Sequence, residues 1–267
     1  MNGLKAISNF TYQIGIELEF YLTKNQQQIV DQKLVEDFIA KLDLKIRKSG
    51  IDLLKIEPEQ GLGQIEIKTK PEKDLEKLIF DLEKVKVITK ELAIQISLEA
   101  DFSPTPFYDD CSSALQINLT VLDKNNQNLF AKNNENESTI LLNSIAALLK
   151  LTPENLHFFT NLKGQNLRFD LVRNQKLFLK GKYPAPVNLS WGYDNRSCAI
   201  RVVGKAENRR LEYRIPDADI NVKKALIKFL EIVNYGTMQN LKVPLQILGP
   251  IYGNAFDQKY QELLPLS

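Results

Sequence analysis

The strongest constraint on the fold is an alternation of apolar and polar side chains that recurs in several short segments. It is clearest in residues 15–20, which read GIELEF. In an extended strand, successive side chains point to opposite faces of the sheet. Glu17 and Glu19 therefore share one face, and Leu18 and Phe20 share the other. The pattern predicts a sheet with one face buried against helices and a second face that is polar.

Four further segments carry amides, carboxylates or arginines on their polar side. They are residues 64–69, 114–121, 197–202 and 209–215. Their polar positions include Gln64, Glu66, Lys68, Gln116, Asn118, Thr120, Arg201, Arg210, Glu212 and Arg214. If these strands belong to one sheet, carboxylates and arginines meet on a single surface.

Two interpretations of this surface are open from the residues alone. The simpler one is a sheet face in contact with water. The other is a binding site, because Glu17 and Glu19 are same-sign neighbours, as are Arg210 and Arg214, and such pairs repel without a counter-ion. Clustered carboxylates suit Mg²⁺ or Mn²⁺, and clustered arginines suit phosphate. Together they are the arrangement that phosphoryl transfer requires.

The remaining periodicity predicts how the chain is organised. Helical spacing is expected in residues 29–48, 71–98, 138–150, 153–161 and 221–235, the fourth opening with the start signal Thr-Pro-Glu. Strands are expected within residues 12–23, 51–57, 64–69, 99–104, 113–121, 187–203 and 209–217. We find no repeat and no clear linker, so residues 1–267 are predicted to form a single domain.

Composition limits the classes of partner. The net charge of +2 and a charged fraction of 25% predict neither a nucleic-acid nor a membrane partner. Two cysteines provide no disulfide framework, and no signal peptide is evident, so we expect a cytoplasmic protein. The single histidine, His157, excludes a histidine-rich metal site.

Taken in order, the motifs of this chain resemble those of the glutamine synthetase catalytic domain and its γ-glutamyl-amine ligase relatives. The motifs are GIELEF, EQGLGQIEI, PAPVNLSWGYDNRSCAIRV, RLEYRIPDADIN and PIYGNAFD, and the resemblance covers roughly residues 12–267. It implies an α+β fold: a curved antiparallel sheet with helices on one face and a funnel on the other. It also implies a two-step reaction, in which ATP phosphorylates a carboxylate of glutamate or a related acid and ammonia or an amine then displaces phosphate.

The resemblance implies a role for each residue of the polar face. The ligands of two Mg²⁺ or Mn²⁺ ions would be Glu17, Glu19, Glu59, Glu66, Gln116 and Glu212. Arg196 and Arg201 would act on the transferred phosphoryl group as catalytic residues. The residues that bind ATP would be Arg196, Arg201, Arg210 and Asn118. Arg214 would bind the acid substrate.

The sequence also departs from the family at several of these positions. Gln116 and Asn118 stand where two histidines are usual, and Cys111 and Ser112 replace an Asn-Gly pair in the substrate loop. An amide oxygen still ligates Mg²⁺, so the first change weakens the site without abolishing it.

The segment before APVN departs further. Phe178 and Pro184 occupy the positions of a glutamate-binding arginine and of a flap glutamate. The cations that could replace the arginine are Arg168, Arg173 and Lys176. We also expect this chain to lack the family's N-terminal β-grasp domain and its C-terminal helices.

These departures leave two functions open. The first is an ATP-dependent carboxylate–amine ligase with impaired or altered activity. The second is a catalytically degenerate paralogue that serves as a nucleotide- or protein-binding module. The chain could also be one half of a split enzyme whose partner chain supplies the missing domain, and an oligomer is open as well.

Overall fold

The structure is a computed structural model that describes residues 10–25, 28–131, 137–161, 167–243 and 249–266. Its strands are β1 (Thr11–Lys24), β2 (Gln28–Ile29), β3 (Leu53–Pro58), β4 (Gln64–Thr69), β5 (Glu99–Asp101), β6 (Leu115–Leu122), β7 (Trp191–Tyr193), β8 (Ile200–Val203) and β9 (Arg210–Tyr213). Its α-helices are α1 (Gln32–Lys48), α2 (Leu75–Gln95), α3 (Thr139–Asn155), α4 (Leu171–Leu179) and α5 (Val222–Met238).

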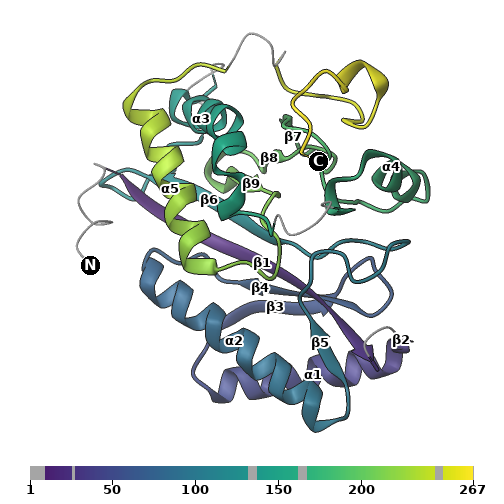
Figure 1. The fold of residues 1–267 in the computed structure, drawn as a ribbon. Helices are drawn as coiled ribbons and strands as arrows, with labels where there is room; N and C mark the ends of the chain where they lie inside the picture. The colour runs from purple at the N-terminus through teal and green to yellow at the C-terminus, as the bar shows by residue number, and fades with distance from the viewer. Residues whose placement is uncertain (1–9, 26–27, 132–136, 162–166, 244–248, 267) are drawn as a thin grey trace.

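The described strands form one mixed, mostly antiparallel sheet in the order β3-β4-β1-β6-β9-β8-β7, with β2 and β5 pairing with β1 off this path. Only β7 and β8 run parallel among the described pairs. The long strand β1 is central, since it pairs with β4 on one side and β6 on the other (Figure 1). Segments far apart in the sequence therefore contribute neighbouring strands, as the sequence predicts.

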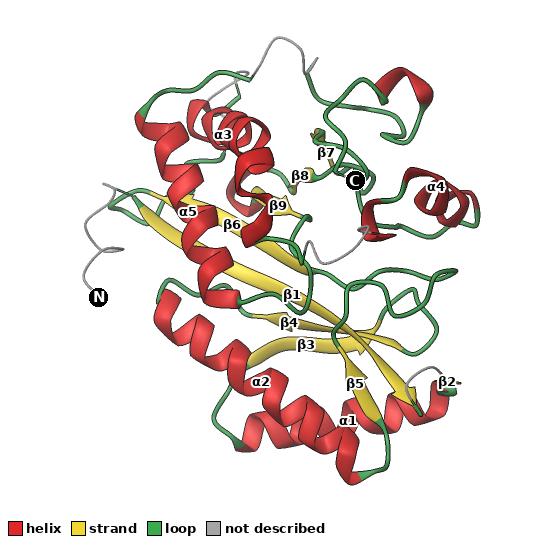
Figure 2. Cartoon of the chain, viewed as in Figure 1, coloured by secondary structure: helices red, strands yellow, loops and turns green. Residues whose placement is uncertain are grey.

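The apolar side of each strand enters one hydrophobic core. Ile16 and Leu18 of β1, Ile67 of β4, Ile117 of β6 and Leu211 of β9 are all buried in it. Helices α1, α2, α3 and α5 contribute their own apolar faces to the same core, and α2 and α5 lie across the sheet in Figure 2. The predicted α+β class with helices on one face is confirmed. No described helix is long and apolar enough to cross a membrane.

The described α-helices begin where a side chain caps the first turn. The capping oxygens belong to Asp31, Asp74, Ser138, Asp170 and Asn221, each of which accepts a backbone N–H two or three residues on. Such a cap stabilises a helix by about 1 kcal/mol. The caps explain why α1 and α2 start later than periodicity alone predicts.

Two helix assignments differ from the sequence prediction. The separate helix expected over residues 153–161 is wrong, because α3 continues through Pro153 to Asn155 and ends in a 3-10 turn, Leu156–Phe158. Proline removes one backbone donor and crowds the preceding turn, and α3 ends two residues after Pro153. The prediction also lacks α4, a short helix capped by Asp170, whose few residues give too little periodic signal.

Close packing of α3 against α5 yields a stability prediction. A methyl group added at Gly236 would lie 2.6 Å from the backbone oxygen of Asn143 and against Ala147. We expect Gly236→Ala to lower the free energy of unfolding by about 1–3 kcal/mol in urea titrations, because overpacking outweighs the helix propensity gained. Gly253→Ala is the matched control, since nothing lies within 4 Å of its methyl position. Equal stability of the two variants would contradict this packing.

Candidate active site

The polar face of the sheet carries a cavity of about 300 Å³ lined almost entirely by charged and amide groups. Its carboxylates are Glu17, Glu19, Glu57, Glu59 and Glu66. Its cations are Lys68, Arg168, Arg196, Arg201, Arg210 and Arg214. Gln116 and Ser112 complete the polar lining. The polar positions predicted from alternation therefore do gather on one surface.

Strand register explains how the carboxylates meet. Glu66 on β4 lies directly opposite Glu19 on β1 and directly opposite Glu57 on β3. Glu17 lies opposite Lys68 on one side and opposite Gln116 on the other. Directly opposed side chains on one sheet face have Cβ atoms about 5 Å apart, so these groups interact strongly.

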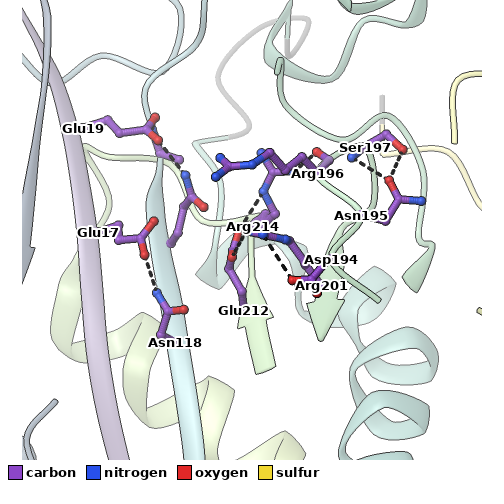
Figure 3. Close-up of polar contacts among 12 residues, drawn as sticks. Glu17, Glu19, Asn118, Asp194, Asn195, Arg196, Ser197, Arg201, Glu212 and Arg214 are labelled. Atoms are coloured by element: carbon purple, nitrogen blue, oxygen red, sulfur yellow. Dashed lines mark hydrogen bonds and ion pairs between the residues drawn. The ribbon is translucent and has the colours of Figure 1, made fainter. Parts of the chain in front are cut away.

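Amides from β6 bind the two glutamates of β1. Gln116 Nε2 donates to Glu19 Oε1 at 2.6 Å. Asn118 Nδ2 donates to Glu17 Oε1 at 3.1 Å (Figure 3). The backbone N–H of Ala114 donates to Glu19 Oε2 at 2.8 Å. Neutral donors orient these carboxylates and leave their negative charge uncompensated.

The pKa values of three glutamates in the cavity are raised. Burial, and then the charge of Glu59, raise the pKa of Glu19 to about 7. Burial raises the pKa of Glu66 to about 9, with Glu19 and Glu17 as the next contributors. The pKa of Glu59 is raised as well, mainly by burial. Burial is the largest cause of each shift, because it disfavours the charged form of a carboxylate, and repulsion between neighbouring glutamates adds to it.

The carboxylate and amide oxygens of this cavity suit a hard divalent cation. Carboxylate and amide oxygens are the ligands that Mg²⁺ and Mn²⁺ take, and added positive charge would relieve the repulsion among these groups. Among the described residues, however, no three His, Cys, Asp or Glu side chains are already arranged as a metal site. Binding a metal there requires side-chain rearrangement.

The predicted ligand Glu212 is engaged by arginines. Arg201 donates to Glu212 Oε2 at 2.9 Å, and Arg214 Nε lies 3.1 Å from its Oε1 (Figure 3). Glu212 is not among the residues that line the cavity, and its side chain is only 3% exposed. Arg214 also donates to the backbone oxygen of Arg196. The carboxylate of Glu212 thus holds two arginine side chains at the cavity wall.

A second cavity of about 660 Å³ adjoins the first. It shares Glu17, Lys68 and Arg210 with the charged cavity. The predicted nucleotide residue Asn118 lines this second cavity, and its Oδ1 accepts from Arg210 Nε at 2.8 Å. The two cavities therefore adjoin, and Arg210 lines both.

Of the three cations that could replace the missing substrate arginine, only Arg168 reaches the charged cavity. Its side chain is 1% exposed, its Nη1 donates to Asp217 at 2.9 Å, and its Nε is buried without a hydrogen-bond partner in the described part of the chain. Arg173 instead donates to Ser112 and to loop carbonyls. Lys176 is exposed on α4.

The two positions at which the resemblance expects an arginine and a flap glutamate hold inert side chains. The ring of Phe178 packs against Phe256, with centroids 5.4 Å apart. Pro184 is buried in the loop between α4 and β7, and its neighbours Tyr183 and Ala185 line the cavity. Neither Phe178 nor Pro184 offers a charge or a proton acceptor.

Sequence reasoning missed several residues of the cavity. Lys68 is visible as a polar position in residues 64–69, but only the fold shows that it contacts Glu66 and Glu57. Tyr183 belongs to an irregular loop, where no periodic pattern exists to reveal it. Its position at the cavity follows from contacts with Gln60 and Arg196.

Comparisons with known proteins agree with this geometry. A family model described as the glutamine synthetase catalytic domain matches residues 4–267. The chain therefore belongs to the glutamine synthetase catalytic-domain family, a family of ligases of nitrogen metabolism that includes γ-glutamyl-amine synthetases. The resemblance inferred from the motifs is confirmed.

Individual relatives match most of this chain but only part of their own length. Identity is 27% over 262 residues with a glutamine synthetase of Clostridium saccharobutylicum, covering 91% of this chain and 56% of that protein. It is 27% over 270 residues with the gamma-glutamylethanolamide synthetase of Streptomyces coelicolor, covering 92% and 54%. The chain thus spans about half the length of these curated relatives.

A solved structure confirms the fold. The ADP complex of GmaS superposes with a TM-score of 0.76 at 17% identity, covering 97% of this chain and 61% of that chain. At this level of identity the likeness establishes the architecture alone.

The buried pair of Arg168 and Asp217 yields a second prediction. Asp217 is fully buried, so Arg168→Met leaves it without its partner. We expect the free energy of unfolding in urea to fall by about 3–5 kcal/mol. Arg47→Met, which breaks an exposed pair with Asp43, is the control and should cost less than about 1 kcal/mol. Comparable losses in the two variants would show that Arg168 is not a buried anchor.

Proposed function

We propose that this chain is the catalytic domain of an ATP-dependent ligase that joins a carboxylic acid to ammonia or an amine through an acyl phosphate. The observation that carries the proposal is the single cavity in which glutamates of β1, β3 and β4 face arginines of β8, β9 and the adjoining loops. Such a surface handles both the phosphates of ATP and a divalent counter-ion.

The metal would be held on the β1–β4 side of the cavity. Glu17, Glu19 and Glu59 would supply carboxylate oxygens there, with Glu66 and Gln116 beside them. A bound Mg²⁺ or Mn²⁺ would neutralise phosphate charge and orient the nucleotide. In this arrangement the hydrogen bonds from Gln116 and Ala114 keep Glu19 turned toward the cavity.

The nucleotide would occupy the two adjoining cavities. Its phosphates fit the charged cavity, and its nucleoside fits the larger, less polar one beyond Asn118 and Arg210. Arg210 stands at the boundary, where it would contact phosphate. Arg196 and Arg201 line the charged cavity and would stabilise the transferring phosphoryl group. The ion pair with Glu212 fixes Arg201 in place, so little reorganisation is required.

The acid would bind at the wall formed by Arg214, Arg168 and Ser112. Two guanidinium groups at one wall suit a carboxylate beyond the one that is phosphorylated, as in glutamate or a related diacid. Ammonia or a primary amine would then attack the acyl phosphate. Relatives that make amides of ethanolamine and putrescine show that the family accepts larger amines.

The proton released by the attacking amine lacks an obvious acceptor. Pro184 cannot supply one, and losing a general base typically slows a reaction about 10²–10⁴-fold. The loop is nevertheless held over the cavity: Tyr183 N donates to Gln60 Oε1 at 2.6 Å, and Arg196 lies 5.1 Å from the Tyr183 ring centroid. We infer impaired or altered turnover, and this observation also favours the alternative of a nucleotide-binding module without turnover.

Binding of ATP tests the shared part of both proposals. Isothermal titration of the protein with ATP should show binding that depends on Mg²⁺. Glu19→Ala should reduce affinity at least tenfold, because it removes a buried carboxylate of the cluster. Glu262→Ala, an exposed glutamate outside both cavities, is the matched control. Equal binding with and without Mg²⁺, or no effect of Glu19→Ala, would contradict the proposed metal site.

Turnover separates the ligase from the binding module. Purified protein with Mg²⁺ and ATP should release ADP when supplied with glutamate plus ammonia or a primary amine. Arg214→Gln should raise the KM for the acid more than the KM for ATP, since Arg214 lines the proposed acid wall. ATP binding without ADP release across a panel of acids and amines would favour the binding module.

A further inference from the structure

Three carboxylates stand in a row across three neighbouring strands. Glu57 of β3 and Glu19 of β1 both lie directly opposite Glu66 of β4. Directly opposed like charges destabilise a sheet. Glu66 is only 3% exposed, so water screens this repulsion poorly. Positive charge close to Glu66 would relieve this repulsion.

Lys68 supplies that charge from within the chain. It follows Glu66 by two residues on β4 and so shares its face. Its Nζ lies 2.7 Å from Glu66 Oε2 and 3.0 Å from Glu57 Oε1. Lys68 is also directly opposite Glu17 on β1, and it lines both cavities. The ammonium group bridges two glutamates, as a bound cation would.

The carboxylate behind the arginine wall of the cavity is also paired within the chain. Glu212 pairs with Arg201 and Arg214, and Gln116 is neutral. The carboxylates of the described cavity that have no ion pair are Glu17, Glu19 and Glu59. These three carboxylates remain available to a divalent ion, whereas Glu57 and Glu66 are already paired with Lys68.

We propose that the site takes one divalent cation, held among Glu17, Glu19 and Glu59, and that Lys68 occupies the position of a second cation beside Glu66 and Glu57. This inference rests on the proposed metal site and goes further, since the resemblance implies two ions. A tethered ammonium cannot be exchanged, so this part of the charge balance is independent of metal concentration.

The number of bound ions tests the inference directly. Mn²⁺ titrations of the full chain, followed by calorimetry and electron paramagnetic resonance, should give one ion per wild-type chain and the signal of an isolated Mn²⁺. Lys68→Met should bind two ions, with spin coupling between them at two equivalents. Lys68→Arg, which keeps the charge, should bind one. Lys70→Met is the matched control: Lys70 pairs with Asp52 outside both cavities and should not change the count.

Each other outcome has a distinct meaning. Two ions in the wild type would overturn the inference and leave the proposed ligase site intact. One ion in both the wild type and a folded Lys68→Met would overturn the role of Lys68. No Mn²⁺ in the wild type or in any variant would overturn the proposed metal site itself. If Lys68→Met does not fold by circular dichroism, the wild-type count still decides between one ion and two.

Discussion

The electrostatic balance on the polar face of β1, β4 and β6 is the constraint on which the rest of this structure depends. Strand pairing brings Glu57, Glu66 and Glu19 into a row, and burial of Glu66 and Glu19 removes the water that would screen those two. Counter-charge nearby stabilises a sheet that carries such a row. The chain provides part of it through Lys68, and a divalent ion would provide the remainder.

The apolar face of the sheet explains how the chain can carry such a charged surface. Ile16, Leu18 and their neighbours bury their side chains in a core that four helices share, and this packing helps to hold the strands in register. A one-residue slip of β1 would exchange Glu17 and Glu19 for Leu18 and Phe20 and expose the core. The same hydrophobic packing that stabilises the fold therefore fixes the positions of the carboxylates.

The sequence predicted what depends on periodicity and missed what depends on contacts between distant residues. Alternation was sufficient to assign Glu17 and Glu19 to the polar face, and the predicted strands were correct apart from their ends and the absence of the short β2. Periodicity predicted neither the continuation of α3 through Pro153 nor the short helix α4, because local signals at helix ends are weak. The pairing of Glu212 with Arg201 and Arg214 depends on the junction of β8 and β9, which no single segment encodes.

The distribution of positive charge also bears on how this site could work. Lysine and arginine side chains sit at both ends of the carboxylate row, and the arginine end is held by Glu212 before any ligand binds. Preorganised charge of this kind favours binding of phosphates, because the protein does not reorganise when they arrive. It does not replace a proton acceptor, which Pro184 cannot be. In the proposed function, nucleotide binding relies on this charge balance and amide synthesis on the loop that holds Pro184, so the two properties are set by different parts of the fold.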